Sequence, residues 1–110
     1  MSVKVKKTKI TMTRGDTAKI DISLVNDNGV IYTPVEGDVI RFAAKKSYTD
    51  EQPCILIDIP IETCELHIKP EDTKNLEQPC NLVYDIEITF KDGTVDTFIK
   101  GELKIEEEVC

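Results

Sequence analysis

The chain has 110 residues, 40% of them hydrophobic and 32% charged, which is the composition of one folded domain spanning residues 1–110. No apolar run approaches the ~20 residues that a membrane helix needs, and the start of the chain has no apolar stretch typical of a secretory signal. The net charge is −7, and outside the first ten residues it is −11, so the body repels phosphate. We therefore expect a cytoplasmic protein with neither a membrane nor a nucleic-acid partner.

The first nine residues form a basic arm, in which apolar and basic side chains alternate as they would in a strand. An extended arm can add to an open sheet edge through main-chain hydrogen bonds, in its own molecule or in a neighbouring one. We favour the neighbour, which would make the protein a homo-oligomer. The candidate interface residues of the arm are Val3, Lys4, Val5, Lys6 and Lys7.

Two alternating segments follow, Ile10–Met12 and Ala18–Leu24, and both predict strands. Between them lies Arg14-Gly15-Asp16, the tripeptide that animal integrins read on adhesive proteins. Glycine permits an unusual backbone conformation and aspartate can bond its own chain two residues on, which favours a turn over an adhesion signal. The segment Asn26–Gly29 also predicts a turn, since it lacks the spacing of a calcium-binding loop. A further strand follows Gly37-Asp38.

The middle of the chain predicts a hairpin and a short helix. Four isoleucines share one face of a strand: Ile55, Ile57, Ile59 and Ile61. A turn at Thr63-Cys64 would place Ile59 opposite Ile68, and His67 opposite Pro60 on the outer face. Because proline cannot donate to a ladder, Pro60 indicates an edge strand. After it, Pro70 with two acidic residues suits the first turn of a helix.

The clearest hairpin surrounds Asp92-Gly93, a pair typical of two-residue type I′ turns. Folding the chain there pairs Phe90 with Val95, Ile88 with Thr97, Ile86 with Ile99 and Leu82 with Leu103, which gives one apolar face. On the other face, Asp85 meets Lys100 and Glu87 meets Phe98. We expect Phe98 to be covered by a second sheet element or by a partner chain, because aromatic side chains are common interface anchors.

No constellation of side chains indicates catalysis or a cofactor. The four cysteines, Cys54, Cys64, Cys80 and Cys110, lack the close pairs of a zinc site and are expected to be free thiols. The lone His67, and the pair Asp85 and Glu87, are interpreted as a solvated strand face. We therefore expect a protein that is not an enzyme, with no metal, no cofactor and no small-molecule substrate.

About seven or eight short strands and one helical crossover predict an all-β fold, an antiparallel immunoglobulin-like β-sandwich. The crossover at residues 66–73 is similar to the corner that joins two sheets in immunoglobulin variable domains. Residues 106–110 are expected to form an acidic tail.

Together these motifs resemble small structural proteins of tailed-phage and prophage tail regions. They are similar to the N-terminal domain of upper baseplate proteins from phages of Gram-positive bacteria. The resemblance covers nearly the whole chain and excludes the cysteines. The matching positions are Thr13 to Asp16, Gly37-Asp38, Pro70 with Asp72-Thr73, Tyr84-Asp85, Asp92-Gly93, Thr97 and Gly101.

The resemblance implies a virion structural component, used in tail or baseplate assembly, that docks to other phage structural subunits. Its location would be the host cytoplasm during assembly and the virion tail afterwards. The alternative is a carbohydrate-binding β-sandwich module for adhesion to the host surface. Such modules present a row of exposed aromatic side chains, which the predicted arrangement of this chain does not provide.

Overall fold

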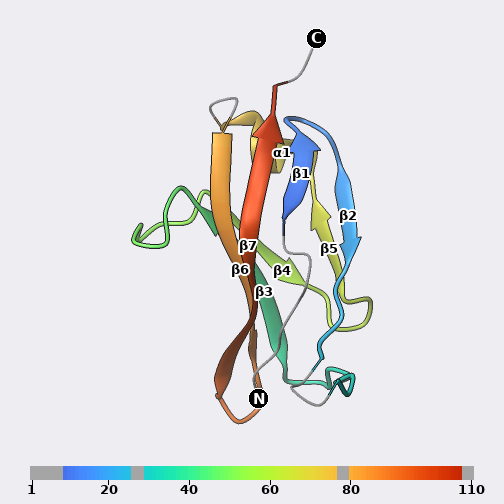
Figure 1. The fold of residues 1–110 in the computed structure, drawn as a ribbon. Coiled ribbons are helices and arrows are strands. Elements are labelled where there is room, and N and C mark those ends of the chain that lie inside the picture. Colours follow the sequence, from blue (N-terminus) through green and yellow to red (C-terminus); the bar gives the residue numbers. More distant parts are fainter. Residues whose placement is uncertain (1–8, 26–28, 77–79, 108–110) are drawn as a thin grey trace.

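The computed structural model describes residues 9–25, 29–76 and 80–107, which form an all-β arrangement with one short helix (Figure 1). The described part has seven strands, within the number expected from the alternation, and none of its helices is long and apolar enough to cross a membrane. The strands are β1 (Ile10–Thr13), β2 (Ala18–Asp21), β3 (Val39–Lys45), β4 (Ile55–Ile59), β5 (Glu65–Ile68), β6 (Cys80–Thr89) and β7 (Val95–Glu106), and the helix is α1 (Pro70–Lys74).

Five strands form the larger sheet, in the order β1-β7-β6-β3-β4. Strand β1 runs parallel to β7, and the other pairs are antiparallel. The inward side chains follow the predicted alternation, because successive residues of a strand point to opposite faces. Ile40, Phe42 and Ala44 of β3 are buried, and they lie beside Ile88, Ile86 and Tyr84 of β6, which are buried as well.

The predicted hairpin between β4 and β5 is wrong. Strand β4 pairs with β3, whereas β5 pairs with β2 in a separate two-stranded sheet. The Cys64 N–H donates to the Pro60 carbonyl at 2.8 Å, which closes a single wide turn, and Cys64 adopts a left-handed φ of +51°. This turn carries the chain to the other sheet, so His67 lies opposite Lys19 instead of Pro60. The prediction that Pro60 marks an edge holds, since β4 ends the larger sheet.

The hairpin of β6 and β7 is present, but its turn has three residues instead of two. The Gly93 N–H donates to the Phe90 carbonyl at 2.8 Å, and the Phe90 N–H donates to the Thr94 carbonyl at 2.8 Å. Gly93, at φ +93°, occupies the left-handed position that such a turn requires. The predicted pairs Phe90 with Val95 and Ile88 with Thr97 are therefore wrong near the turn.

A bulge then restores the predicted register farther from the turn. Ile86 pairs with Ile99 but Glu87 pairs with Thr97, so Phe98 is the extra residue of β7. The pairs Asp85 with Lys100 and Leu82 with Leu103 are confirmed, whereas Glu87 does not meet Phe98. Because the bulge reverses the alternation, Val95 is 56% exposed, and it is Asp96 that pairs with the buried Ile88.

The tripeptide Arg14-Gly15-Asp16 forms a turn, as predicted. The Asp16 N–H donates to the Thr13 carbonyl at 3.1 Å, and Gly15 has a φ of +84°. The turn packs against α1, because the Gly15 N–H donates to Thr73 Oγ1 at 2.8 Å and the Arg14 guanidinium donates to the Lys74 carbonyl. The predicted helix is also confirmed, and Pro70 occupies its first turn.

Two further predictions concern the loop at 26–29 and the chain end. Residues 26–28 and 108–110 lie outside the described residues, and Gly29 has a left-handed φ of +78°. Glu106 does not belong to a tail. It is the last residue of β7, pairs with Thr13, and accepts a hydrogen bond from the Arg14 N–H at 2.9 Å.

Candidate docking surfaces

A buried carboxylate fixes one end of the molecule. Asp38 is 6% exposed, and its Oδ2 accepts hydrogen bonds from the Tyr32 hydroxyl at 2.5 Å and from the Val35 N–H at 3.0 Å. Its Oδ1 accepts from the Lys91 N–H at 3.1 Å, so one side chain joins the 32–38 loop to the β6–β7 turn. The Tyr32 ring also contacts Phe90 edge to face, with centroids 5.5 Å apart. Both segments are therefore held in a defined arrangement.

The charge of Asp38 is stabilised by these contacts. Burial by itself raises the pKa of the carboxyl, but the hydrogen bonds from Tyr32, Val35 and Lys91 together outweigh it, and the pKa lies below its ordinary value. The same hydrogen bond, together with burial, raises the pKa of the Tyr32 hydroxyl. At neutral pH, Asp38 is therefore an ionised structural group and Tyr32 is its neutral donor.

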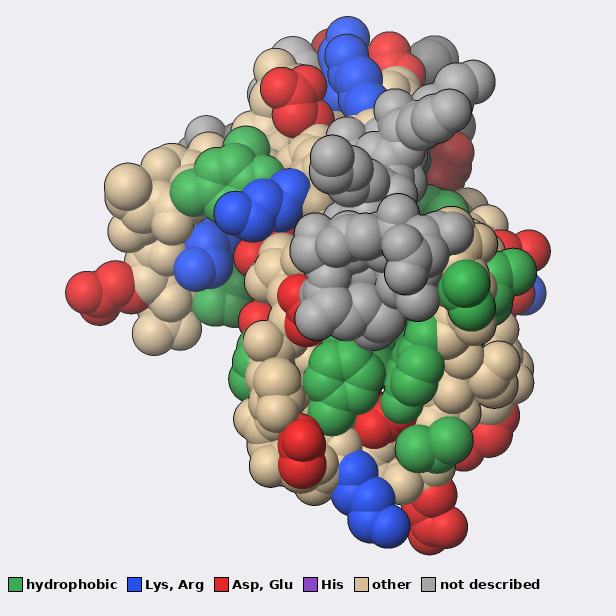
Figure 2. Space-filling view, turned by 60° about the horizontal axis from the view of Figure 1, so that its bottom comes forward, with side chains coloured by type: hydrophobic (Ala, Val, Ile, Leu, Met, Phe, Trp, Pro, Cys, Tyr) green, Lys and Arg blue, Asp and Glu red, His purple; other side chains and the backbone are tan. Residues whose placement is uncertain are grey.

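Exposed apolar side chains gather at this same end, which we call the apolar end. Figure 2 turns this end toward the viewer and shows hydrophobic side chains at the surface with charged ones between them. Seven large hydrophobic side chains of the described residues are exposed. Five of them belong to residues 30–39 or to the start of β7, in or next to the segments that Asp38 joins. Ile31 is the most exposed, at 69%. The five residues are Val30, Ile31, Val35, Val39 and Val95.

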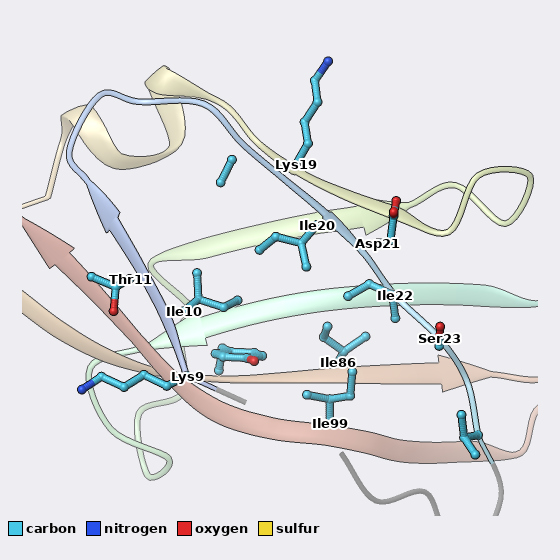
Figure 3. A pocket seen from close by; sticks show the side chains of 13 residues that line it. Lys9, Ile10, Thr11, Lys19, Ile20, Asp21, Ile22, Ser23, Ile86 and Ile99 are labelled. Atoms are coloured by element: carbon cyan, nitrogen blue, oxygen red, sulfur yellow. The ribbon is translucent and has the colours of Figure 1, made fainter. Parts of the chain in front are cut away.

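A cleft of about 670 Å³, which we call the edge cleft, lies between the edges of the two sheets. In Figure 3, Ile20 and Ile22 point from the β2 segment toward Ile86 and Ile99, while Lys19 points away. The walls are partly exposed and the floor is buried. The lining of the edge cleft includes Lys9, Ile10, Ile20, Ile22, Ile86 and Ile99.

Both strands beside the edge cleft are edge strands of their sheets. Strand β1 is the outermost strand of the larger sheet, and β2 has only β5 as a partner among the described strands. The Ile22 N–H donates to the Cys64 carbonyl at 2.8 Å, toward β5. Since backbone groups of an antiparallel strand alternate in direction, those of Lys19 and Asp21 point away from β5. These groups can accept a further strand.

The interface residues expected from the sequence are not tested by the structure. The arm residues Val3, Lys4, Val5, Lys6 and Lys7 lie outside the described residues. The backbone of Phe98 is the bulge of β7, and its side chain also lies outside what the structure describes.

The apolar end and the edge cleft were both missed by sequence reasoning. The sequence did indicate that Val30, Ile31 and Val35 are exposed. These apolar residues lie in a segment without strand alternation, so no buried strand face is available to them. Nothing in the sequence placed the edges of β1 and β2 on the two sides of one cleft, since that depends on which strands pair.

Side chains that can bind a metal ion or act as nucleophiles are dispersed over the described residues. No group of three or more histidine, cysteine, aspartate or glutamate side chains among the described residues could hold a metal ion. Of the three cysteines that the structure describes, Cys54 and Cys64 are free thiols, the first exposed and the second partly buried. Burial raises the pKa of the Cys64 thiol, which makes it a weaker nucleophile than an exposed cysteine.

Aromatic side chains do not line up on the described surface. Phe42 and Tyr84 are buried in contact with each other, with centroids 5.2 Å apart, and burial raises the pKa of Tyr84 to about 12. Tyr48 is the exposed aromatic residue of the described set, and the Lys100 ammonium lies 5.8 Å from the centre of its ring. The described residues therefore show one exposed aromatic ring and no row of such rings.

The fold and these surfaces define an all-β protein with an apolar end and an open edge cleft. No family model matches the chain, and no curated protein matches it.

Proposed function

We propose that this protein is a non-enzymatic structural component of a phage or prophage tail region, active in tail or baseplate assembly by docking to other phage structural subunits. The phage assignment is supported by the sequence resemblance described above. The mode of action is supported by the apolar end.

The apolar end is the observation that favours docking over chemistry. Soluble monomers rarely leave several large apolar side chains together at one exposed site, whereas interfaces combine such residues with a polar rim. Glu36, Lys91 and Asp92 are exposed beside the apolar end and provide such a rim. Because Asp38 holds the loop and the hairpin in place, little conformational entropy is lost when a partner binds.

The architecture of this component is an immunoglobulin-like β-sandwich. Three features support it: the five-stranded and two-stranded sheets contribute to one apolar core, β1 runs parallel to the last strand, and α1 links β5 to β6. The protein would fold in the host cytoplasm and then enter the virion tail. Its expected partners include further copies of the same chain beside different tail subunits.

The test is to determine whether the chain is present in purified phage particles. Particles induced from the encoding bacterium would be purified by density gradient and quantified by mass spectrometry against the major capsid protein. A fixed copy number per particle is expected. Its absence from intact tailed particles, with the protein present in the same cells, would refute the phage assignment.

Two variants test the docking surface. Ile31→Asp with Val95→Asp places charges on the apolar end and is expected to reduce incorporation into particles while leaving the fold intact. The matched control is Leu56→Asp, since Leu56 is as exposed as Val95 but lies on β4. Equal incorporation of the two variants would show that docking does not use the apolar end.

A further inference from the structure

We propose that the outer edge of β2 pairs antiparallel with β2 of a second copy of the chain, with Ile20 at the centre of the pair, so that the two-stranded sheets of the two copies join in a symmetric dimer. The inference concerns contacts between identical chains and does not depend on the phage assignment.

The backbone of β2 directs one set of hydrogen-bonding groups to its outer edge. Strand β2 pairs with β5, and the Ile22 N–H donates toward β5, to the Cys64 carbonyl, at 2.8 Å. Because backbone groups of an antiparallel strand alternate in direction, those of Lys19 and Asp21 point to the other side. None of the described strands pairs with β2 on that side. Such an edge can pair with a strand of another chain.

This direction of the backbone groups restricts how a second β2 can add. In an antiparallel pair, outward-directed residues of one strand must stand opposite outward-directed residues of the other strand. A symmetric pair can therefore be centred on a residue but not between two residues. The centres that leave most of the strand paired are Lys19, Ile20 and Asp21.

Charge selects the centre at Ile20. A centre at Lys19 would place that lysine opposite the partner's Lys19, and a centre at Asp21 would oppose two aspartates in the same way. With the centre at Ile20, Lys19 stands opposite the partner's Asp21, and Asp21 stands opposite the partner's Lys19. Both side chains are exposed and point away from the face of Ile20 and Ile22 (Figure 3). Opposite charges directly across two strands are favourable, whereas like charges are unfavourable.

The same pairing offsets an unfavourable contact within one molecule. Asp21 stands opposite Glu65 of β5, so two acidic side chains are neighbours in the small sheet. In the proposed dimer, the partner's Lys19 lies on the other side of Asp21 and supplies the opposite charge. The dimer therefore gives Asp21 a favourable neighbour in addition to its acidic one.

The inner face of β2 gains apolar contacts in this register. Ile20 is partly buried and lines the edge cleft. It would stand opposite the partner's Ile20 at a position without backbone hydrogen bonds, where side chains approach most closely. Ala18 would stand opposite the partner's Ile22. Burial of these side chains adds to the backbone hydrogen bonds of Lys19 and Asp21.

Exchange of the two charges tests the proposal. Asp21→Lys would oppose like charges at both ends of the pair and should raise the dissociation constant of the dimer at least about tenfold, and Lys19→Asp should do the same. An equimolar mixture of the two variants regains opposite charges and should form a mixed dimer with about the wild-type constant. Variants that had failed to fold would not form this mixed dimer.

The matched control is Glu51→Lys, which changes the net charge as Asp21→Lys does. Glu51 is exposed in the loop of residues 46–54, which lies on the other side of the molecule from β2 in Figure 1. This variant should keep the wild-type dissociation constant.

Sedimentation equilibrium between about 10 μM and about 1 mM measures the constant, since so short a strand pair forms a weak dimer. Hydrogen exchange locates the contact. The amides of Lys19 and Asp21 should become protected as the protein concentration rises, whereas the Ile20 amide, which faces β5, should be protected at every concentration.

Three results would overturn the proposal. The first is a monomer over the whole concentration range, and the second is a dimer that neither charge variant weakens. The third is protection of the Lys19 and Asp21 amides that does not depend on concentration, because this edge would then be covered within a single chain.

Discussion

Replacing Asp38 by asparagine should destabilise the protein strongly, although the side chains have nearly the same shape. One carboxylate accepts three hydrogen bonds, from Tyr32, Val35 and Lys91, at a site that is 6% exposed. In the amide, one of the two oxygens becomes a donor. Whichever oxygen is replaced, a backbone N–H of Val35 or Lys91 then faces another donor, and the remaining bonds lose their ionic contribution.

The magnitude follows from these lost contacts. A buried donor without an acceptor costs about 1–3 kcal/mol, and hydrogen bonds to charged groups contribute about 1.5–3 kcal/mol each. We therefore expect Asp38→Asn to lower the free energy of unfolding by roughly 2–4 kcal/mol, from a total of about 5–15 kcal/mol for a domain of this size. The midpoint of thermal unfolding should fall by roughly 10–15 °C.

The dependence on pH provides a second signature. The folded pKa of Asp38 lies below its ordinary value of 3.8, so the folded state binds fewer protons than the unfolded state. Its contribution to stability is therefore complete above about pH 4 and is lost as the pH falls through the folded pKa. The difference between the wild type and Asp38→Asn should be constant near neutral pH and should shrink in acid.

The assay is urea unfolding followed by far-ultraviolet circular dichroism at several pH values. Asp58→Asn is the matched control, because Asp58 is bound to Arg41 at 2.9 Å on the surface and is 71% exposed. An exposed ion pair contributes about 0–1 kcal/mol, so this variant should unfold nearly like the wild type. A similar small loss for Asp38→Asn, or a loss that persists unchanged at pH 2, would refute the reasoning about the buried carboxylate.

Three other predictions concern Thr73, the thiols and Phe98. Thr73→Val should lower the free energy of unfolding by about 1–3 kcal/mol, because it leaves the Gly15 N–H without its acceptor, while Thr73→Ser should cost less; equal losses in urea unfolding would contradict this. Titration of denatured, freshly purified protein should find four free thiols, and in the native protein exposed Cys54 should react before Cys64; two or fewer thiols, or stoichiometric zinc, would overturn that interpretation. Phe98→Ser should lower either thermal stability or assembly, and no change in both would make Phe98 an ordinary surface residue.

The individual strands could be predicted because each carries its own alternation. The segments of β3 and β6 place apolar residues at every second position, and burial of that face determines which residues point inward. The alternation within a strand does not predict which other strands it pairs with. Strand β4 followed by β5 favoured a hairpin, but the turn closed from Pro60 to Cys64 sends the two strands into different sheets.

In the hairpin of β6 and β7, one pairing was predicted correctly although the predicted turn was wrong. Gly93 suits a two-residue turn and also the three-residue turn that forms, so the dipeptide alone does not fix the register near the turn. The bulge at Phe98 then compensates for the extra turn residue. The pairing of Ile86 with Ile99 agrees with the prediction because two one-residue shifts cancel.

The candidate surfaces could not be predicted because their residues become neighbours only through tertiary contacts. Asp38 and Lys91 are 53 residues apart, and no local pattern connects them. The apolar end depends on this contact and on the bulge, since the bulge turns Val95 outward. The edge cleft depends on β2 choosing β5 as its partner.

The motifs that carry the family resemblance meet in space as two pairs. Gly15 of the Thr-Arg-Gly-Asp turn bonds Thr73 of the Pro-x-Asp-Thr crossover, and Asp38 of the Gly-Asp motif bonds Lys91, next to Asp92-Gly93. Each pair joins segments more than 50 residues apart, so these motifs maintain the fold itself. In the docking role proposed above, the choice of partner would then reside in residues outside the motifs. The exposed side chains of the apolar end meet that requirement, because Ile31 and Val95 can change without breaking either contact.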